Sequence, residues 1–491
     1  MSFATVMKEN ANGKYTENGA VAYSSLNNSL LELFAQIGAL RPRSEEEIVA
    51  KFASAFAQDE LLATKMLFYA GNIRGGLGER RIFRICLKWL ANEHPSIVQK
   101  NIENIPHFNR WDSLFELIGT PCEKMMWCFI HNQFMKDWRA YRNGESCSLL
   151  AKWLPSENAS SKKTKELALK TASVLHLTPR NYRKTLSELR AYIRVVEKSM
   201  SAQKWDEIEY SAVPSRAMSI YSQAFNRHDM ERFGAYREAL NKGEVKVNAS
   251  TLYPYDLVKN FSVYSMRQEN LVAEAQWKAL PNYIEGENNV LIMADVSGSM
   301  HGRPMDTSVG LAIYFAERNK GEYQNLYMTF TDKPHFVQID PNATLRKKVY
   351  QVMNTDVGLS TNLEAAFDYV LNHAVKNRVS PNEMPQAIAV ISDMEIDKYM
   401  NSCSWYEEFN WSFVDEMKIR FAEKGYQLPK LILWNVEARN DTFLHKSNDV
   451  LFVSGQSPSV FKSFLGALNG ETAWDIMIKT LNDEMYDCVQ I

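Results

Sequence analysis

The first 285 residues have the hydrophobic pattern of a protein built from α-helices. Apolar residues recur at spacings of three and four, and short breaks with Pro, Asn or Gly separate the periodic stretches. The clearest stretches are 45–58, 59–73, 80–93, 186–200 and 219–241. Many helices joined by short loops predict a HEAT-like helical-repeat domain over 1–285. The pattern leaves open whether these helices form an open solenoid or close into a ring.

The pattern changes after a segment containing Pro281 and Gly286, which is typical of a linker. From there, short apolar runs alternate with helical patterns. The runs predicted to be strands are 289–294, 325–330, 386–392, 430–436 and 449–454. Nearly continuous apolar strands between helices are typical of a parallel sheet covered on both faces. We therefore predict a doubly wound, mostly parallel α/β domain over 286–491.

Polar residues follow the first predicted strand of this domain. Asp295, Ser297 and Ser299 alternate directly after it, and two further polar segments, 358–362 and 392–397, lie next to other predicted elements. In open α/β sheets, ligands bind in the crevice beyond the carboxyl ends of the strands. We expect the three segments to converge at that edge.

The converging side chains offer only hard oxygen ligands. The candidates are Asp295, Ser297, Ser299, Thr361 and Asp393. Such a set with few carboxylates suits Mg²⁺ or Mn²⁺. An ion held in this way keeps an open position, which an acidic side chain of a protein partner could fill. The alternative is that the aspartate and serines only cap the next helix.

Residues 293–300, 358–362 and 390–397 resemble the metal-ion-dependent adhesion site (MIDAS) of von Willebrand factor A domains. This resemblance covers about 290–491. In that family an aspartate, two serines, a threonine and a distant aspartate bind the metal directly or through water. The resemblance assigns these roles to the same five residues.

The helical part resembles the TROVE module of Ro autoantigens, and a TROVE-related family that joins such a module to a von Willebrand half. The segments that carry this resemblance are 69–83, 109–117, 151–158, 213–218 and 224–233. In Ro proteins a ring of helical repeats binds the ends of misfolded small RNAs in its hole and structured RNAs on its basic outer surface. The resemblance implies a ribonucleoprotein with a small non-coding or misfolded RNA as its partner.

Basic residues of the helical part offer their own support for RNA binding. Arg80, Arg84 and Lys88 follow one another at four-residue steps, which places them on one helical face. Glycines at 75, 76 and 78 are expected to keep the loop before them open. A second stripe, Arg183, Arg190 and Arg194, falls within about 40° on a helical projection. The candidate RNA-binding residues are Arg74, Arg80, Arg84, Lys88, Arg110, Lys152, Arg183, Arg190 and Arg194.

Aromatic residues lie beside these cations. Trp111, Trp153 and Tyr182 could stack on unpaired bases. The alternative is that the basic stripes are solvated helix faces and that the tryptophans anchor the core.

Charge and composition narrow the class of protein. The net charge is −2, but residues 1–285 hold 38 Lys and Arg against 31 Asp and Glu, whereas 286–491 hold 18 against 27. The basic half favours a polyanionic partner. No apolar run is long enough to span a membrane, and the first residues lack the pattern of a signal peptide. The six cysteines form no CxxC pair. We expect a cytoplasmic monomer with reduced thiols.

Catalysis finds little support in the sequence. His107 near Asp112 and His228 beside Asp229 could form acid/base pairs, but no nucleophile accompanies them. We therefore predict a non-enzymatic RNA-binding protein. The main alternative is a metal-dependent protein-interaction scaffold without RNA binding, and the third is a metal-dependent nuclease.

Overall fold

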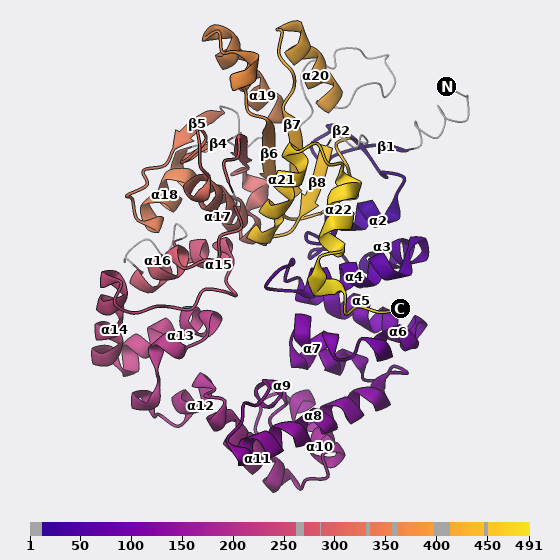
Figure 1. Ribbon diagram of the computed structural model, residues 1–491, viewed down its shortest axis with the longest axis vertical. Coiled ribbons are helices and arrows are strands. Elements are labelled where there is room, and N and C mark those ends of the chain that lie inside the picture. The colour runs from indigo at the N-terminus through magenta and orange to yellow at the C-terminus, as the bar shows by residue number, and fades with distance from the viewer. Residues whose placement is uncertain are drawn as a thin grey trace.

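An arc of helices, α2 to α16, forms the first part of the chain (Figure 1). The computed structural model describes residues 12–261, 270–284, 286–329, 334–355, 362–396, 413–445 and 450–491. The arc consists of α2 (Ser29–Gln36), α3 (Glu45–Gln58), α4 (Glu60–Gly71), α5 (Arg80–Glu93), α6 (Pro95–Lys100), α7 (Asn104–Phe108), η1 (Trp111–Leu117), α8 (Glu123–Asn143), α9 (Leu150–Trp153), α10 (Lys162–Val174), α11 (Pro179–Tyr192), α12 (Val196–Ser201), η2 (Trp205–Glu207), η3 (Tyr210–Ala212), α13 (Ser215–His228), α14 (Met230–Lys242), α15 (Pro254–Val258), η4 (Lys259–Phe261) and α16 (Leu271–Lys278).

Helix α3 shows why these segments become helices. Ser44 and Glu47 form a capping box, in which each side chain accepts a hydrogen bond from the other residue's backbone N–H. Ile48, Phe52 and Phe56 are buried along one side. Because a helix presents every third or fourth residue on the same face, the apolar spacing seen in the sequence becomes one buried stripe.

A six-stranded sheet forms the second part of the chain, which we call the α/β part. Its strand order is β5-β4-β3-β6-β7-β8, and every neighbouring pair is parallel except β4 and β5. The strands are β3 (Val290–Ala294), β4 (Leu326–Thr329), β5 (His335–Gln338), β6 (Ala387–Ser392), β7 (Lys430–Asn435) and β8 (Val450–Ser454). The structure thus confirms the prediction of an α part combined with a mostly parallel α/β part.

Helices cover both faces of this sheet. One core holds alternate residues of β3, such as Val290 and Ile292, with α17, α18, α21 and α22, whereas a second holds Leu291 and Met293 with α19 and α20. Burial on both faces explains why the strands read as continuous apolar runs. The helices of this part are η5 (Gly298–Met300), α17 (Arg303–Arg318), α18 (Leu345–Thr355), α19 (Leu363–Lys376), η6 (Pro381–Glu383), α20 (Phe413–Glu423), η7 (Pro458–Phe461), α21 (Lys462–Leu468), α22 (Ala473–Leu481) and η8 (Glu484–Tyr486).

The hydrophobic pattern did not predict three short strands. Strand β5 is an antiparallel edge strand with three of its four residues exposed, so it carries no continuous apolar run. Strands β1 (Gly13–Tyr15) and β2 (Val21–Tyr23) form a hairpin before the arc. Tyr23 of this hairpin forms an antiparallel bridge with Phe443, so the hairpin belongs spatially to the α/β part.

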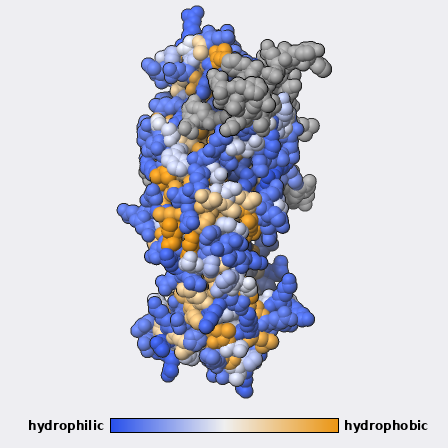
Figure 2. Space-filling model, turned by 90° about the vertical axis from the view of Figure 1, so that its right-hand side faces the viewer, coloured by the Kyte–Doolittle hydropathy of each residue, from blue (hydrophilic) through white to orange (hydrophobic). Residues whose placement is uncertain are grey.

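The arc and the α/β part together form a ring around a central opening (Figure 1). The loop between α4 and α5 meets the end of the arc, where the Tyr253 hydroxyl donates to the Ile73 carbonyl (3.3 Å) and the Tyr283 hydroxyl to the Arg74 carbonyl (3.0 Å). Ser459 of η7 donates to the carbonyl of Gly76 in the same loop (3.0 Å). Seen from the side the molecule is a narrow slab (Figure 2), so the opening runs through its thin dimension.

The last described residues also join the two parts. Tyr486 accepts a hydrogen bond from Asn72 (3.2 Å), and its ring stacks on Phe108 with the centroids 5.3 Å apart. The Lys65 ammonium donates to Asn482 (2.9 Å). The arc therefore completes its core with residues from the far end of the sequence.

Two predictions from composition can be compared with the structure. Within the described ranges, no helix is both long and apolar enough to cross a membrane. Five of the six cysteines lie in the described part of the chain, and all five are free thiols.

Candidate nucleic-acid interface and metal site

The central opening is a cavity of about 2050 Å³ lined by residues from all around the arc. Fourteen basic residues line it against four acidic ones, and eight aromatic residues lie among them. All nine basic residues predicted from the sequence are in this lining: Arg74, Arg80, Arg84, Lys88, Arg110, Lys152, Arg183, Arg190 and Arg194. The structure thus brings both predicted stripes to one cavity.

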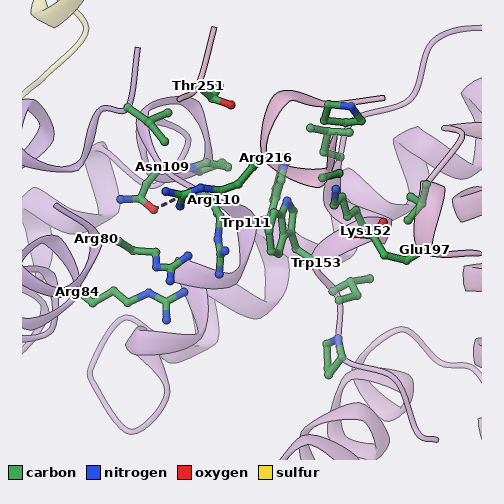
Figure 3. A pocket seen from close by; sticks show the side chains of 18 of the residues that line it. Arg80, Arg84, Asn109, Arg110, Trp111, Lys152, Trp153, Glu197, Arg216 and Thr251 are labelled. Atoms are coloured by element: carbon green, nitrogen blue, oxygen red, sulfur yellow. Dashed lines mark hydrogen bonds between the residues drawn. The ribbon is translucent and has the colours of Figure 1, made fainter. Parts of the chain in front are cut away.

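Arginine side chains gather on one wall of the cavity (Figure 3). Arg80 and Arg84 come from the solvent face of α5, Arg110 from the start of η1, and the Arg216 side chain reaches this group from α13. Asp112 pairs with both Arg84 (2.9 Å) and Arg110 (2.8 Å from Nε). This wall therefore carries more positive than negative charge.

Arg80 is the least neutralised member of this group. Burial lowers the pKa of Arg80, and the neighbouring guanidiniums of Arg110 and Arg84 lower it further, while Asp112 raises it. Among the described residues no carboxylate forms an ion pair with Arg80. Arg216 is paired with Asp256 (3.0 Å). A group of like charges held together in this way binds anions well.

The carboxylate of Asp112 pairs with the arginines of this wall and does not form the acid/base pair with His107 that the sequence suggested. Burial raises the pKa of Asp112, but the ion pairs with Arg110 and Arg84 lower it more, so the net shift is downward. His228 and Asp229, the second candidate acid/base pair, also have structural roles. The His228 ring stacks on Trp205 with the centroids 4.5 Å apart, and Asp229 accepts a hydrogen bond from Tyr210 (2.6 Å).

The second predicted stripe is not one helical face, and its member Arg190 has a structural role. Helix α11 ends at Tyr192, and Arg194 lies beyond it with φ +53°, so the assumption of one continuous helical face for Arg183, Arg190 and Arg194 was wrong. The Arg190 guanidinium donates to the Ala151 carbonyl (2.8 Å), the Leu154 carbonyl (2.7 Å) and the Ser156 hydroxyl (2.7 Å). Its hydrogen bonds hold the α9 segment in place.

Aromatic side chains divide between core and wall. Tyr182 is buried and donates to the Pro155 carbonyl (2.7 Å), so it is a core anchor. Trp111 and Trp153 are half-buried at the cavity wall. The Arg110 guanidinium lies over the Trp153 ring, 3.9 Å from its centroid. Trp153 and Arg110 thus form a flat stacked surface beside the arginines.

The glycine-rich loop before α5 is closed, contrary to the expectation that it keeps the approach open. A Cβ atom on Gly76 would lie 2.1 Å from the Tyr69 carbonyl oxygen, and one on Gly78, at φ +66°, would lie 2.3 Å from the Tyr253 hydroxyl. Gly76 allows the loop to pack closely on the end of α4, and Gly78 allows it to pack on Tyr253 from the far end of the arc.

The predicted metal ligands are buried at the carboxyl end of the sheet. Asp295, Ser297 and Asp393 are at most 1% exposed. The Ser297 and Ser299 hydroxyls lie 3.1 Å apart, and the Ser297 backbone N–H donates to Asp295 (2.9 Å). Thr361 lies outside the described residues. The structure therefore brings four of the five predicted ligands together in one place.

The two carboxylates differ in their partners. Asp295 Oδ2 accepts a hydrogen bond from the Ser392 hydroxyl (2.6 Å), whereas the buried Oδ2 of Asp393 has no hydrogen-bond partner in the described structure. Burial raises the pKa of Asp295 to about 6, against the lowering effect of its hydrogen bonds from Ser297 and Ser392. Buried carboxylate oxygens beside two hydroxyls fit a hard divalent cation. Within the described ranges no cluster of three or more His, Cys, Asp and Glu forms another metal site.

Sequence reasoning missed several residues of these sites. Arg216 and Arg303 line the cavity from the far side of the ring, Ser392 holds Asp295, and Arg439 lies 3.6 Å from Asp393. Ser392 could have been found, because it directly precedes Asp393. No local signal identifies the arginines, since chain segments far apart in sequence bring them in.

Two family models match most of the chain. The family model described as Domain of unknown function (DUF2828) matches residues 16–110 and 131–289, and that described as Domain of unknown function (DUF7788) matches 289–487. Uncharacterized protein L728 of Acanthamoeba polyphaga mimivirus is 29% identical over 501 residues, which cover 93% of this chain and 85% of that protein. The crystal structure of the Deinococcus radiodurans Ro (RSR) protein covers 90% of this chain and 93% of its own, with 15% identity and a TM-score of 0.39. At that level no function is transferred from it. Because the first family model matches more than half of the sequence, this chain belongs to the family described as Domain of unknown function (DUF2828).

Proposed function

We propose that this chain is a non-enzymatic RNA-binding protein whose central opening holds an unpaired segment of a small structured or misfolded RNA. The observation that carries the proposal is the excess of cations in the opening, fourteen basic residues against four acidic ones. Phosphate contacts supply most of the affinity of such complexes, because each neutralised phosphate releases a counterion. The excess favours a polyanion over a neutral or cationic ligand.

The size and shape of the opening support a polymeric ligand. Its volume of about 2050 Å³ exceeds the roughly 300–1,000 Å³ of small-molecule sites. Basic residues from widely separated elements also line it, among them Arg80 on α5, Arg183 on α11 and Lys198 on α12. A chain of phosphates can contact all these sides at once, whereas a single small anion cannot.

The aromatic residues favour unpaired RNA. Bases in a double helix already stack on one another, so they offer no free faces to a protein side chain. Trp111 and Trp153 lie at the wall beside the arginine group (Figure 3). An unpaired base could stack there while its phosphate contacts Arg80 or Arg84, as in other single-strand binding proteins.

The test uses protein stripped of nucleic acid and RNA with an unpaired 3′ tail. A variant with Arg80, Arg84 and Arg216 changed to Glu should lose most of its affinity for this RNA. The control changes Lys204 and Lys479, which are exposed and lie outside the opening, to Glu. Equal affinities of the two variants, or a stripped protein that binds no RNA at any salt concentration, would reject the proposal.

The second part of the proposal concerns the α/β part. We propose that Asp295, Ser297, Ser299, Thr361 and Asp393 bind Mg²⁺ or Mn²⁺, as in von Willebrand factor A domains, with Thr361 assigned from that resemblance alone. The buried Oδ2 of Asp393, which accepts no hydrogen bond in the described structure, supports the assignment. Such an ion would supply an open coordination position for an acidic side chain of a protein partner.

Two variants separate this role from the alternatives. Asp295→Ala should abolish metal-dependent capture of a protein partner and leave RNA affinity unchanged. If it lowers RNA affinity to the same extent, the metal site serves RNA binding instead. Magnesium-dependent RNA degradation that disappears in Asp393→Ala would favour a nuclease and overturn the non-enzymatic assignment.

A further inference from the structure

We propose that Arg439 is a built-in cation of the metal site, so that a divalent ion binds there only in competition with its guanidinium. This inference rests on the metal-binding part of the proposed function. Arg439 lies in the loop that follows β7, at the same edge of the sheet as the candidate ligands.

The contacts of Arg439 place its charge at the site itself. Its Nη2 lies 3.6 Å from Asp393 Oδ2, the oxygen without a hydrogen-bond partner, and donates to the backbone carbonyl of Ser299. The same nitrogen lies 3.2 Å from the Glu437 carboxylate. Arg439 thus contacts two of the candidate metal-binding residues with a single positively charged group.

The position of Arg439 is fixed from the helical arc. The Ala438 backbone N–H donates to the Ala39 carbonyl (3.0 Å), and Arg43 donates to the backbone carbonyl of Arg439 itself. Arg43 also pairs with Asp441 (2.8 Å). The backbone is therefore held on both sides of Arg439, and besides Asp393 the guanidinium contacts the Ser299 carbonyl and the Glu437 carboxylate.

This arrangement opposes a second cation. A divalent ion bound to the buried Asp393 would lie close to the Arg439 guanidinium, whose side chain is 31% exposed, so the two cations would repel each other through a partly screened interaction. The Glu437 carboxylate offsets part of this repulsion. Removing the charge of Arg439 should tighten binding by at least about tenfold, and removing the charge of Glu437 should weaken it.

The experiment measures Mn²⁺ affinity of the full chain by electron paramagnetic resonance, with Asp295→Ala as the variant that lacks a ligand. Arg439→Gln, which removes the positive charge and keeps a polar side chain, should bind Mn²⁺ at least about tenfold more tightly than the unmodified chain. Arg439→Lys keeps the charge and should stay near the unmodified affinity. Glu437→Gln should bind more weakly. Thermal melting of each variant shows that it is folded.

Each result has a distinct meaning. Unchanged or weaker binding in Arg439→Gln, with binding lost in Asp295→Ala, overturns the role of Arg439 and leaves the metal site standing. Tightening in Arg439→Lys equal to that in Arg439→Gln also overturns it, because size and not charge would then be responsible. If neither the unmodified chain nor Arg439→Gln binds Mn²⁺, the metal site itself is rejected. A glutamine variant that does not fold leaves the decision to Glu437→Gln, whose unchanged or tighter binding would reject the inference.

Discussion

Arg80→Gln removes a cation that no carboxylate neutralises within the described structure. Arg84 and Arg110 share Asp112 (2.9 Å and 2.8 Å), so part of their charge is already balanced. A hydrogen bond from a charged group to a phosphate contributes about 1.5–3 kcal/mol, and the partial exposure of Arg80 favours the low end of this range. We expect Arg80→Gln to lower RNA affinity roughly tenfold, and Arg84→Gln to lower it less.

The salt dependence of RNA affinity distinguishes the loss of one phosphate contact from a general loss of structure. Each phosphate contact to single-stranded nucleic acid adds about 0.7 to the slope of log affinity against log salt concentration. Arg80→Gln should reduce the slope by about that amount. Fluorescence anisotropy with a labelled unpaired oligonucleotide, between about 50 and 200 mM KCl, measures it. An unchanged slope, or an equal effect of Lys479→Gln outside the opening, would refute the assignment of Arg80.

Three further predictions concern stability. Gly76→Ala should lower the free energy of unfolding by roughly 1–3 kcal/mol more than Gly234→Ala, because a Cβ on Gly76 meets the Tyr69 carbonyl oxygen at 2.1 Å and one on Gly234 meets nothing within 4 Å. Chemical denaturation compares the two variants, and equal losses would contradict the close packing. Arg190→Ala should cost roughly 2–4 kcal/mol and leave RNA affinity little changed, since its guanidinium binds backbone carbonyls; a large affinity loss in the folded variant would contradict this role. Hydrogen bonds from Lys170 and from the backbone of Gly119 lower the pKa of Glu123 to about 2, so its stabilisation is present above the ordinary value of 4.5 and lost as the pH falls toward 2. Glu123→Gln should flatten the acid side of a melting-temperature profile, and an unchanged profile would show that the hydrogen bonds add no stability.

Local patterns predicted the elements well where burial is regular. The parallel strands are buried on both faces, so their apolar runs stand out, and β3 was expected at 289–294 and lies at Val290–Ala294. The spacing of Asp295, Ser297 and Ser299 also predicted their shared location, because it depends on a single strand end. Strands of three residues, such as β1 and β2, are too short to produce a periodic signal.

Contacts between distant segments could not be predicted in the same way. The face of α5 that carries Arg80 was visible in the sequence, but its meeting with Arg216 depends on how the ends of the arc close. Arg190 shows that a helical projection can also assign a wrong role to a residue. A helical projection places it on a basic stripe, yet the backbone carbonyls of Ala151 and Leu154 bind its guanidinium. Only the packing of α9 against α11 distinguishes these two cases.

The contact between Tyr486 and Asn72 affects when the core of the arc can form during synthesis. Asn72 lies 414 residues before Tyr486 in the chain, and ribosomes add about 5–20 residues per second, so Asn72 waits roughly 20–80 seconds for Tyr486 to be synthesised. During that time the Phe108 face and the start of the arc expose apolar surface to the cell. This part of the arc therefore acquires its complete core only after η8 (Glu484–Tyr486) has been synthesised.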